Sequence, residues 1–199
     1  STGETILGDS YNIGPGGKGC NQAIAISRLG GKVNFISKLG NDDYGKLAID
    51  KLKKDNINTS NIIISNKYKT GVAGIHVDRN TGKNAITVVR GAPSTLTSKE
   101  IDTKLFKQSK IFLTQLEIPI AVTLDCLKAA KEYGLINILN PAPACELSND
   151  FFKLIDYFTP NESEAEFYTG VRINNENDAK TSAKKLIEMG IKKVIITLG

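Results

Sequence analysis

The chain has 199 residues, of which 40% are apolar and 24% are charged, and 26 basic residues exceed 21 acidic ones. No apolar run approaches the ~20 residues of a membrane-spanning helix, and the lysines are scattered, so the sequence argues against a membrane protein and a nucleic-acid-binding protein. His76 is the only histidine, which excludes most Ser–His, Cys–His and His-based zinc chemistry.

The cysteines are odd in number and follow no metal-binding or disulfide spacing: Cys20, Cys126 and Cys145. They predict reduced thiols and a cytoplasmic location. The positive net charge of +5 is typical of a solvated surface, and a bias around an anionic nucleotide is the alternative interpretation.

A glycine-rich stretch runs from Gly14 to Asn21, before an amphipathic helix predicted over 22–29 and ended by Gly30. Glycine backbone adopts positive φ readily and can approach another molecule closely. A turn of this kind before a helix presents unpaired N–H groups and the positive end of a dipole. We interpret the stretch as a site for a polar, phosphate-bearing small molecule, with a turn that binds nothing as the alternative.

The same stretch has the G-x-G-x-x-G spacing of dinucleotide-binding proteins, so a nicotinamide-dependent oxidoreductase is a second functional class to consider. The context argues against it, because residues 4–13 are half polar and the second predicted strand ends in Lys38 instead of an acid. The phosphate-binding Walker pattern fails as well, since Lys18 is followed by Gly19.

Downstream, strands and helices alternate as in a βαβ protein. Strands are predicted over 33–38, 62–65, 110–115, 135–139, 156–159 and 193–198, and helices over 44–54, 99–109, 119–133, 162–169 and 177–189. Residues 70–78 and 84–90 alternate apolar and polar side chains, which predicts an antiparallel hairpin with one solvated face. With 4–13 as a further strand, this sheet is predicted to be a lid beside the glycine-rich turn.

Polar side chains lie at the ends of the predicted parallel strands: Glu117, Asn140 and Asn161 follow their strands, while Thr197 and Gly199 end the last one. The carboxyl ends of parallel strands meet at one edge of a sheet, where open α/β proteins bind their ligands. A carboxylate, two amides and a hydroxyl on that edge suit the recognition of hydroxyl and phosphate groups better than acyl transfer.

Structural roles are the alternative for each of these residues. Asn161 and Glu164 have the spacing of a helix capping box. Glu117 could be a solvated acid near a helix start, Asn140 could fix a turn before a proline, and Lys18 could be a surface lysine.

Five motifs, in this order along the chain, resemble the ribokinase family of PfkB-type sugar kinases: Gly16–Ala23, Gln115–Glu117, Asn140–Ala144, Thr159–Glu166 and Ile195–Gly199. The resemblance implies a ribokinase-like α/β/α core with a mostly parallel sheet over 15–69 and 93–199. It implies a small antiparallel β-sheet lid over 1–14 and 70–92. The implied reaction is MgATP-dependent phosphorylation of D-ribose at the 5-hydroxyl, and related kinases act on deoxyribose, fructose or adenosine.

The resemblance also implies roles for individual residues. The sugar-binding loop would comprise Gly16, Gly17, Lys18, Gly19, Cys20 and Asn21, with the lysine reaching toward the phosphates. Glu117 would bind a sugar hydroxyl, and Glu164 would hold Mg²⁺ through water. The ATP contacts would come from Asn161, Thr197, Leu198 and Gly199. A homodimer formed through the lid is implied too.

By the same resemblance the chain is expected to be an internal fragment that is inactive alone. The family's first strand, with a sugar-binding Asn and Asp, would precede Ser1. The catalytic aspartate of a Gly-Ala-Gly-Asp segment, and the segments that bind adenine and K⁺, would follow Gly199. At 91–94 the chain has Gly-Ala-Pro-Ser where the family usually has Gly-Ala-Asn. A non-catalytic fragment that only pairs through its lid is a further alternative.

Overall fold

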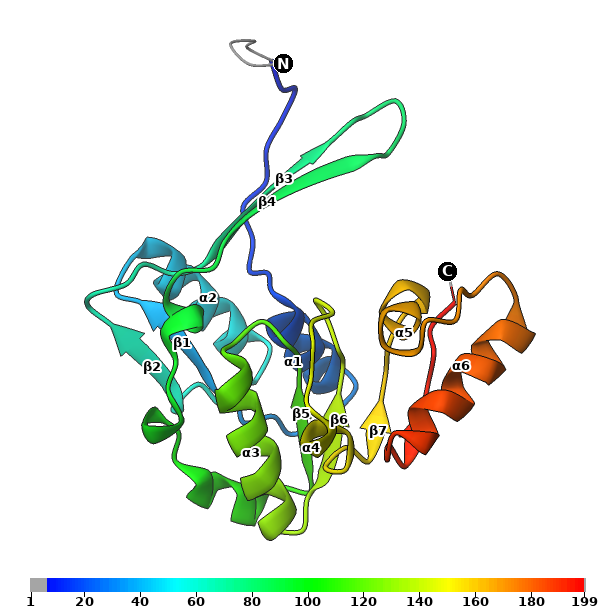
Figure 1. The fold of residues 1–199 in the computed structure, drawn as a ribbon. Helices are drawn as coiled ribbons and strands as arrows, with labels where there is room; N and C mark the ends of the chain where they lie inside the picture. The colour runs from blue at the N-terminus through cyan, green and yellow to red at the C-terminus, as the bar shows by residue number, and fades with distance from the viewer. Residues whose placement is uncertain (1–6, 199) are drawn as a thin grey trace.

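A computed structural model describes residues 7–198, and Figure 1 shows a body of short strands and helices from which one long hairpin projects. The α-helices are α1 (Lys18–Arg28), α2 (Asp43–Lys54), α3 (Ile120–Glu132), α4 (Asn149–Phe152), α5 (Glu162–Thr169) and α6 (Glu176–Glu188). The strands are β1 (Ser37–Gly40), β2 (Ile62–Ser65), β3 (Val72–Val77), β4 (Asn84–Val89), β5 (Ile111–Thr114), β6 (Ile136–Leu139), β7 (Tyr157–Phe158) and β8 (Lys193–Val194). Three 3₁₀ turns are η1 (Ala92–Thr95), η2 (Ser98–Glu100) and η3 (Thr103–Gln108).

The body contains two parallel sheets, one formed by β1 and β2 and the other by β5, β6, β7 and β8 in that order. In the larger sheet, Thr114 pairs with Leu139, Leu139 with Phe158, and Phe158 with Val194. These pairs lie at or near the carboxyl ends of the strands. The residues that follow the strands therefore share one edge, as the sequence predicts.

The main hydrophobic core packs the four-stranded sheet against the helices that connect its strands. Leu139, Phe158 and Leu127 are fully buried, and Phe152 and Phe158 meet edge to face with ring centroids 6.4 Å apart. Burying a leucine or phenylalanine side chain is worth about 1.5–3 kcal/mol. The strand ends are therefore held by a well-packed body.

None of the helices between residues 7 and 198 is both long and apolar enough to cross a membrane.

Helix α1 begins four residues earlier than the sequence predicts, because Gly17 acts as the N-terminal boundary with φ +91° and ψ 141°. The strand predicted over 33–38 begins later, at Ser37, and Asn34 forms only an isolated bridge with Asn58. The last predicted strand, 193–198, is regular only at β8 and continues as an isolated bridge at Thr197.

The helix predicted over 99–109 is wrong: the segment folds as two short 3₁₀ turns. Thr97 closes a capping box with Glu100 around η2, and Ile101 then adopts an extended conformation with ψ 118°. Asp102 starts η3 by accepting a hydrogen bond from the amide of Lys104. Two capping residues five positions apart therefore restart the turn before a helix can propagate, since short helices need tertiary packing to persist.

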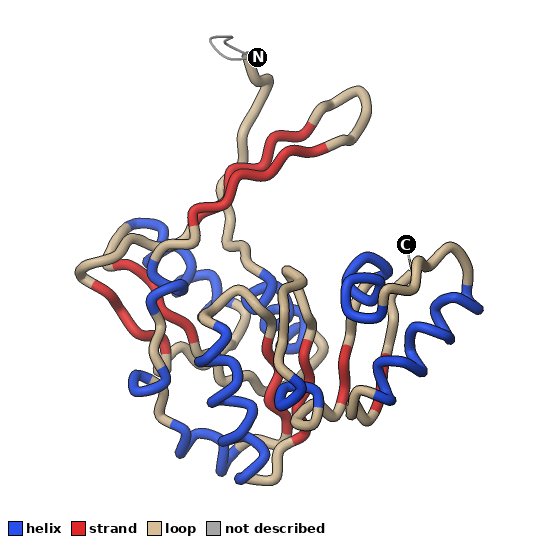
Figure 2. The backbone as a smooth tube through the Cα atoms, in the orientation of Figure 1, coloured by secondary structure: helices blue, strands red, loops and turns tan. Residues whose placement is uncertain are grey.

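The antiparallel hairpin of β3 and β4 is confirmed, but its surroundings differ from the prediction. Every residue of both strands is exposed, so both faces are solvated. The sequence predicts the third strand over 4–13. Residues 7–13 form no strand, and residues 4–6 lie outside the described part of the chain. An exposed ion pair from Arg79 to Asp9, 3.4 Å long, links the hairpin turn to this segment. Figure 2 shows the hairpin standing away from the helices.

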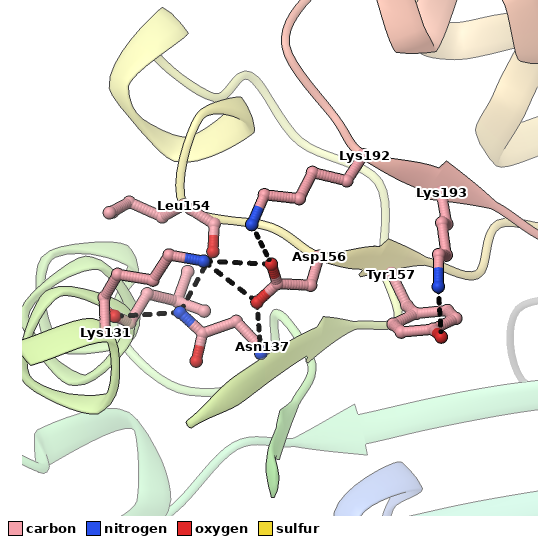
Figure 3. A network of polar contacts seen from close by, with 8 residues as sticks. Lys131, Asn137, Leu154, Asp156, Tyr157, Lys192 and Lys193 are labelled. Atoms are coloured by element: carbon pink, nitrogen blue, oxygen red, sulfur yellow. Dashed lines mark hydrogen bonds and ion pairs between the residues drawn. The ribbon is translucent and has the colours of Figure 1, made fainter. Parts of the chain in front are cut away.

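A polar network joins α3, β6, β7 and β8 at the amino ends of the strands (Figure 3). The carboxylate of Asp156 accepts hydrogen bonds from Lys131, from Lys192 at 2.7 Å and from the backbone amide of Asn137 at 2.9 Å. The Asn137 side chain, fully buried, donates to the carbonyls of Leu127 and Leu154. Burial alone would raise the pKa of Asp156, but these hydrogen bonds outweigh burial and lower it to about 2.

We expect Asp156→Asn to lower the free energy of unfolding by about 2 kcal/mol at neutral pH, because one pKa unit corresponds to ~1.4 kcal/mol. The folded-state pKa lies below the ordinary value of 3.8, so the carboxylate stabilises the fold above about pH 4. This stabilisation disappears as the pH falls through about 2. Urea titrations between pH 2 and 7 should show the two proteins converge at acid pH. Asp50→Asn, at an exposed position of α2, is the control. Its free energy of unfolding should remain within about 0.5 kcal/mol of the parent value at every pH, because surface changes rarely have larger effects.

Candidate active site

The polar residues that follow β5, β6, β7 and β8 come together at one edge of the sheet. The Asn140 amide N–H donates to the Thr114 carbonyl, and its side-chain amide donates to the Thr159 carbonyl at 2.8 Å. Asn161 forms a parallel bridge with Thr197. Strand order and these bonds thus place the Glu117, Asn140, Asn161 and Thr197 positions in sequence along the edge.

The glycine-rich turn reaches this edge through a contact between residues 99 positions apart. The backbone N–H of Lys18, the first residue of α1, donates to Oε2 of Glu117 at 2.9 Å. A side chain on Gly17 would place its Cβ 3.7 Å from the same carboxylate oxygen, and its φ of +91° favours glycine. A helix N-terminus and a carboxylate therefore face one another, with the Lys18 side chain exposed beside them.

Gln115 and Gln22 also belong to this region, although the sequence assigns neither a role of its own. The Gln115 side-chain amide donates to the side-chain oxygen of Gln22, which joins the end of β5 to the first turns of α1. The Gln115 oxygen lies so close to Gly19 that an added Cβ there would come within 2.8 Å of it. A side chain at position 19 would therefore displace the Gln115 side chain, and only the spatial neighbourhood of β5 and α1 explains this close packing.

The other residues of the predicted sugar-binding loop differ in their exposure to solvent. Cys20 packs in a buried cluster with Ala23, Leu52 and Ile57, so its side chain lies in the core. Burial, and secondarily the charge of Asp55, raises the pKa of the Cys20 thiol. Asn21, like Gly16, is exposed, and its amide N–H donates to the carbonyl of Gly17. At Cys20, therefore, the backbone can contact a ligand and the side chain cannot.

The predicted capping box at the start of α5 is confirmed. The Asn161 side-chain oxygen accepts from the amide of Glu164 at 2.8 Å, and the Glu164 Oε2 accepts from the amide of Asn161 at 2.9 Å. Glu164 is 9% exposed, so the box lies partly inside the protein. The Thr197 amide N–H donates to the Pro160 carbonyl, which holds the last strand against this helix start. Leu198 follows with half of its surface exposed, and Gly199 lies outside the described residues.

A half-buried tyrosine supports the loop between β6 and α4. The Tyr168 hydroxyl donates to the Cys145 carbonyl at 2.9 Å and accepts from the Cys145 amide at 3.4 Å. Burial raises the pKa of Tyr168 to about 12, so the phenol remains a donor at neutral pH. This contact fixes the Asn140–Ala144 loop against α5, beside the capping box.

This arrangement has the chemistry of a site for hydroxyl and phosphate groups. Glu117 supplies hydrogen-bond acceptors for hydroxyls, while Lys18 and two helix N-termini, of α1 and α5, supply positive potential for anions. Within residues 7–198, no three His, Cys, Asp or Glu side chains gather as a metal-ligand cluster. The dinucleotide-binding alternative gains no support, because residues 7–17 contain no strand leading into the glycine-rich turn.

Comparison with known proteins gives one consistent family. Residues 1–199 match the pfkB family carbohydrate kinases. The chain is 42% identical over 201 residues to a bifunctional ribokinase/ribose-5-phosphate isomerase A of Fructilactobacillus sanfranciscensis, covering 99% of the chain and 37% of that protein. It is 41% identical over 199 residues to a ribokinase of Haemophilus influenzae, covering 99% and 65%. A deoxyribokinase of Salmonella typhi is 33% identical, with coverage of 99% and 65%.

Solved structures agree with the sequence relatives. The ribokinase of Thermotoga maritima superimposes with a TM-score of 0.87 at 37% identity, covering 100% of this chain and 65% of that one. The Arabidopsis thaliana ribokinase complexed with ribose and ATP has a TM-score of 0.89 at 28% identity and the same coverage. The chain thus spans about two thirds of the length of these ribokinases.

Proposed function

Because the chain belongs to the pfkB family of carbohydrate kinases, we propose that it is the greater part of a ribokinase, which transfers the γ-phosphoryl group of MgATP to the 5-hydroxyl of D-ribose. Its fold is ribokinase-like, as the superpositions on ribokinases establish. The observation that carries the proposal is the 2.9 Å bond from the Lys18 amide to Glu117, which joins the glycine-rich turn to the ligand-binding edge of the sheet.

On the sugar side, we assign Glu117 to a ribose hydroxyl and the backbone of residues 16–21 to the wall of the sugar site. A carboxylate that accepts hydroxyl protons forms charge-assisted hydrogen bonds, which are about twice as strong as neutral ones. The Lys18 side chain is exposed at the same place and carries the cation that would meet the transferring phosphoryl group. The assignment of this loop to the sugar follows the family resemblance, and the contact with Glu117 supports it.

On the nucleotide side, we assign Asn161, Thr197, Leu198 and Gly199 to ATP, and Glu164 to Mg²⁺ through water. The partly buried carboxylate fits this ion, since Mg²⁺ keeps several waters and uses one or two carboxylates together with substrate phosphates. The bound ion would neutralise charge on the phosphates. A K⁺ site beyond Gly199 is part of the same proposal.

In the proposed reaction, the 5-hydroxyl oxygen forms a bond to the γ-phosphorus while the bond from that phosphorus to the β–γ bridging oxygen breaks. ADP leaves with the electron pair, and the hydroxyl proton passes to a general base. The family resemblance assigns this base to an aspartate beyond Gly199. The residues of this chain would bind and orient the two substrates, which is the main contribution of proteins to phosphoryl transfer.

Deoxyribose is the second candidate substrate, because a deoxyribokinase is 33% identical over 200 residues. The two sugars differ by one hydroxyl. A site built to hydrogen-bond that hydroxyl would reject the sugar that lacks it, because a buried polar group would stay unpaired.

The test measures sugar-dependent formation of ADP by the full-length protein that contains this chain, with ribose, 2-deoxyribose, fructose and adenosine offered separately. We expect the highest kcat/KM with ribose. Calorimetric titration of the 199-residue chain with ribose measures the binding contribution of the described site alone. Turnover of fructose or adenosine without turnover of ribose would contradict the proposal.

We also propose that the protein acts in the cytoplasm as a homodimer joined through the hairpin. All three cysteines are free thiols, which suits a reducing compartment. One hairpin face carries Ile75 opposite Ile86, with Val77 and Val88 beside them, and each of the four is more than half exposed. The hairpin is thus amphipathic, as the sequence predicts, but its apolar face has no cover within the described chain. A second copy presenting the same face would cover it.

Sedimentation velocity over a range of concentrations tests this dimer. We expect Ile75→Asp to shift the protein toward monomer by at least ~10-fold in dissociation constant, because a charge in an apolar interface stays desolvated and unpaired. Thr87→Asp is the matched control, since Thr87 lies in β4 on the opposite hairpin face, across from Gly74. Equal effects of the two changes, or a monomeric parent protein, would contradict the assignment of this face.

A further inference from the structure

The base of the hairpin is held by one carboxylate that also begins a helix. Oδ1 of Asp42 accepts from the amide of Gly45 at 2.9 Å, which caps the N-terminus of α2. The same side chain accepts twice from Thr70, the residue that precedes the hairpin: from its amide to Oδ2 and from its hydroxyl to Oδ1, both at 2.8 Å. The Thr70 hydroxyl in turn accepts from the amide of Gly40 at the end of β1. Asp42 therefore joins β1, α2 and the hairpin.

Close backbone packing makes this junction narrow. A Cβ on Gly71 would lie 2.5 Å from the Arg90 carbonyl oxygen, and one on Gly91 would lie 2.5 Å from the Gly71 nitrogen. Gly91 also has a φ of +56°, in the region that favours glycine. The two chain segments that enter and leave the hairpin thus touch backbone to backbone. The entering segment also packs against the end of β1, since a Cβ on Gly40 would lie 2.5 Å from the Thr70 nitrogen.

Beyond this junction, few contacts with the rest of the described chain fix the direction of the hairpin. All residues of β3 and β4 are exposed, and the ion pair from Arg79 to Asp9 joins two side chains that are each more than three quarters exposed. Exposed pairs of this kind contribute at most about 1 kcal/mol. Thr70 is 8% exposed, so its bonds to Asp42 are shielded from water. Hydrogen bonds from the Thr70 and Gly45 amides lower the pKa of Asp42, which therefore remains a carboxylate at neutral pH.

We propose that Asp42, acting through Thr70, is a positioning residue that sets the direction of the hairpin over the candidate active site. Figure 1 shows the hairpin leaving the body on the side where the chain enters α1, next to the segment that leads into the glycine-rich turn. A change in the direction of the hairpin would therefore change how the lid meets a sugar bound at Lys18 and Glu117. The catalytic consequence rests on the proposed kinase function, whereas the mechanical role does not.

The variants separate the capping role of Asp42 from its hold on the hairpin. Asp42→Ser keeps a good N-cap residue for Gly45 but has no second oxygen to accept from the Thr70 amide, which Oδ2 of Asp42 does in the parent protein. Thr70→Val keeps the shape of the side chain and removes its hydroxyl, leaving α2 capped. Asn175→Ser is the matched control, because Asn175 caps α6 through the amides of Asn177 and Asp178 and has no part in the hairpin junction.

Spin labels at Asn80→Cys in the hairpin turn and Lys180→Cys on α6 report the direction of the hairpin through their distance distribution. The background carries Cys145→Ser, because the other two cysteines are buried. We expect Asp42→Ser and Thr70→Val to broaden or shift the distribution, and Asn175→Ser to leave it unchanged. Amide exchange at Gly40 should rise about 10-fold in Thr70→Val, since one shielded hydrogen bond is lost.

Unchanged distributions in both Asp42→Ser and Thr70→Val would overturn the proposal and leave Asp42 as a helix cap alone. In the full-length protein, the same two variants should lower kcat/KM for the sugar more than Asn175→Ser does at equal thermal stability. Changed distance distributions in the variants, together with a parent protein that neither binds nor turns over ribose and ATP, would refute the kinase function. They would still support the role of Asp42 in positioning the hairpin.

Discussion

Replacing Lys18 by methionine is expected to lower kcat for sugar phosphorylation by about 10²–10³-fold, with little change in either KM. Lys18 is the first residue of α1, and its amide is fixed by Glu117, so its side chain starts from a defined place at the site. The cation would interact most strongly as charge shifts on the transferring phosphoryl group. Interactions that grow in the transition state appear in kcat, and the removal of one preorganised contact typically costs ~10²–10³-fold.

Methionine keeps most of the apolar stem of lysine, and the side chain is exposed, so the fold should be nearly unaffected. The measurement is kcat and both KM values of the full-length enzyme, together with a thermal melt. Lys32→Met removes an exposed lysine that lies after α1 and outside the site, and it should behave like the parent. A Lys18→Met enzyme that melts normally and turns over at the parental rate would make Lys18 a surface lysine.

Replacing Glu117 by glutamine is expected to weaken ribose binding by about 10–100-fold while ATP binding changes little. Charge-assisted hydrogen bonds contribute roughly 1.5–3 kcal/mol, and ~1.4 kcal/mol corresponds to a factor of ten in affinity. The glutamine side chain has the same length and still offers an oxygen to the Lys18 amide, so the start of α1 can remain in place. The change thus removes the negative charge and one acceptor without removing the contact that organises the site.

Calorimetric titrations with ribose and with ATP measure the two affinities separately. Glu132→Gln, at an exposed position in the last turn of α3, controls for the general loss of one negative charge. If ATP affinity falls while ribose affinity is retained, Glu117 belongs to the nucleotide site. A parallel loss of both affinities with a lowered melting temperature would mean that Glu117 chiefly holds α1 against β5.

Local chemistry was sufficient to predict much of the fold. The α5 helix has the bounds predicted from its sequence, because Asn161 and Glu164 cap it and Gly170 ends it with φ +68°. The parallel strands were recognisable as short apolar runs separated by amphipathic helices. Since such strands align their carboxyl ends, the sequence alone also predicted that Glu117, Asn140, Asn161 and Thr197 would share an edge. The bounds of α5 and the apolar strand runs depend on residues within a few positions of one another.

Only the tertiary structure decided which of these residues touch. Glu117 meets the Lys18 amide across 99 positions, Gln115 meets Gln22 across 93, and Asp42 meets Thr70 across 28. No local pattern encodes such pairs, because the packing of helices on the sheet brings them together. The exposed faces of the hairpin have the same origin. Alternation in β3 and β4 specifies two different faces, but whether either face is covered depends on what packs against it.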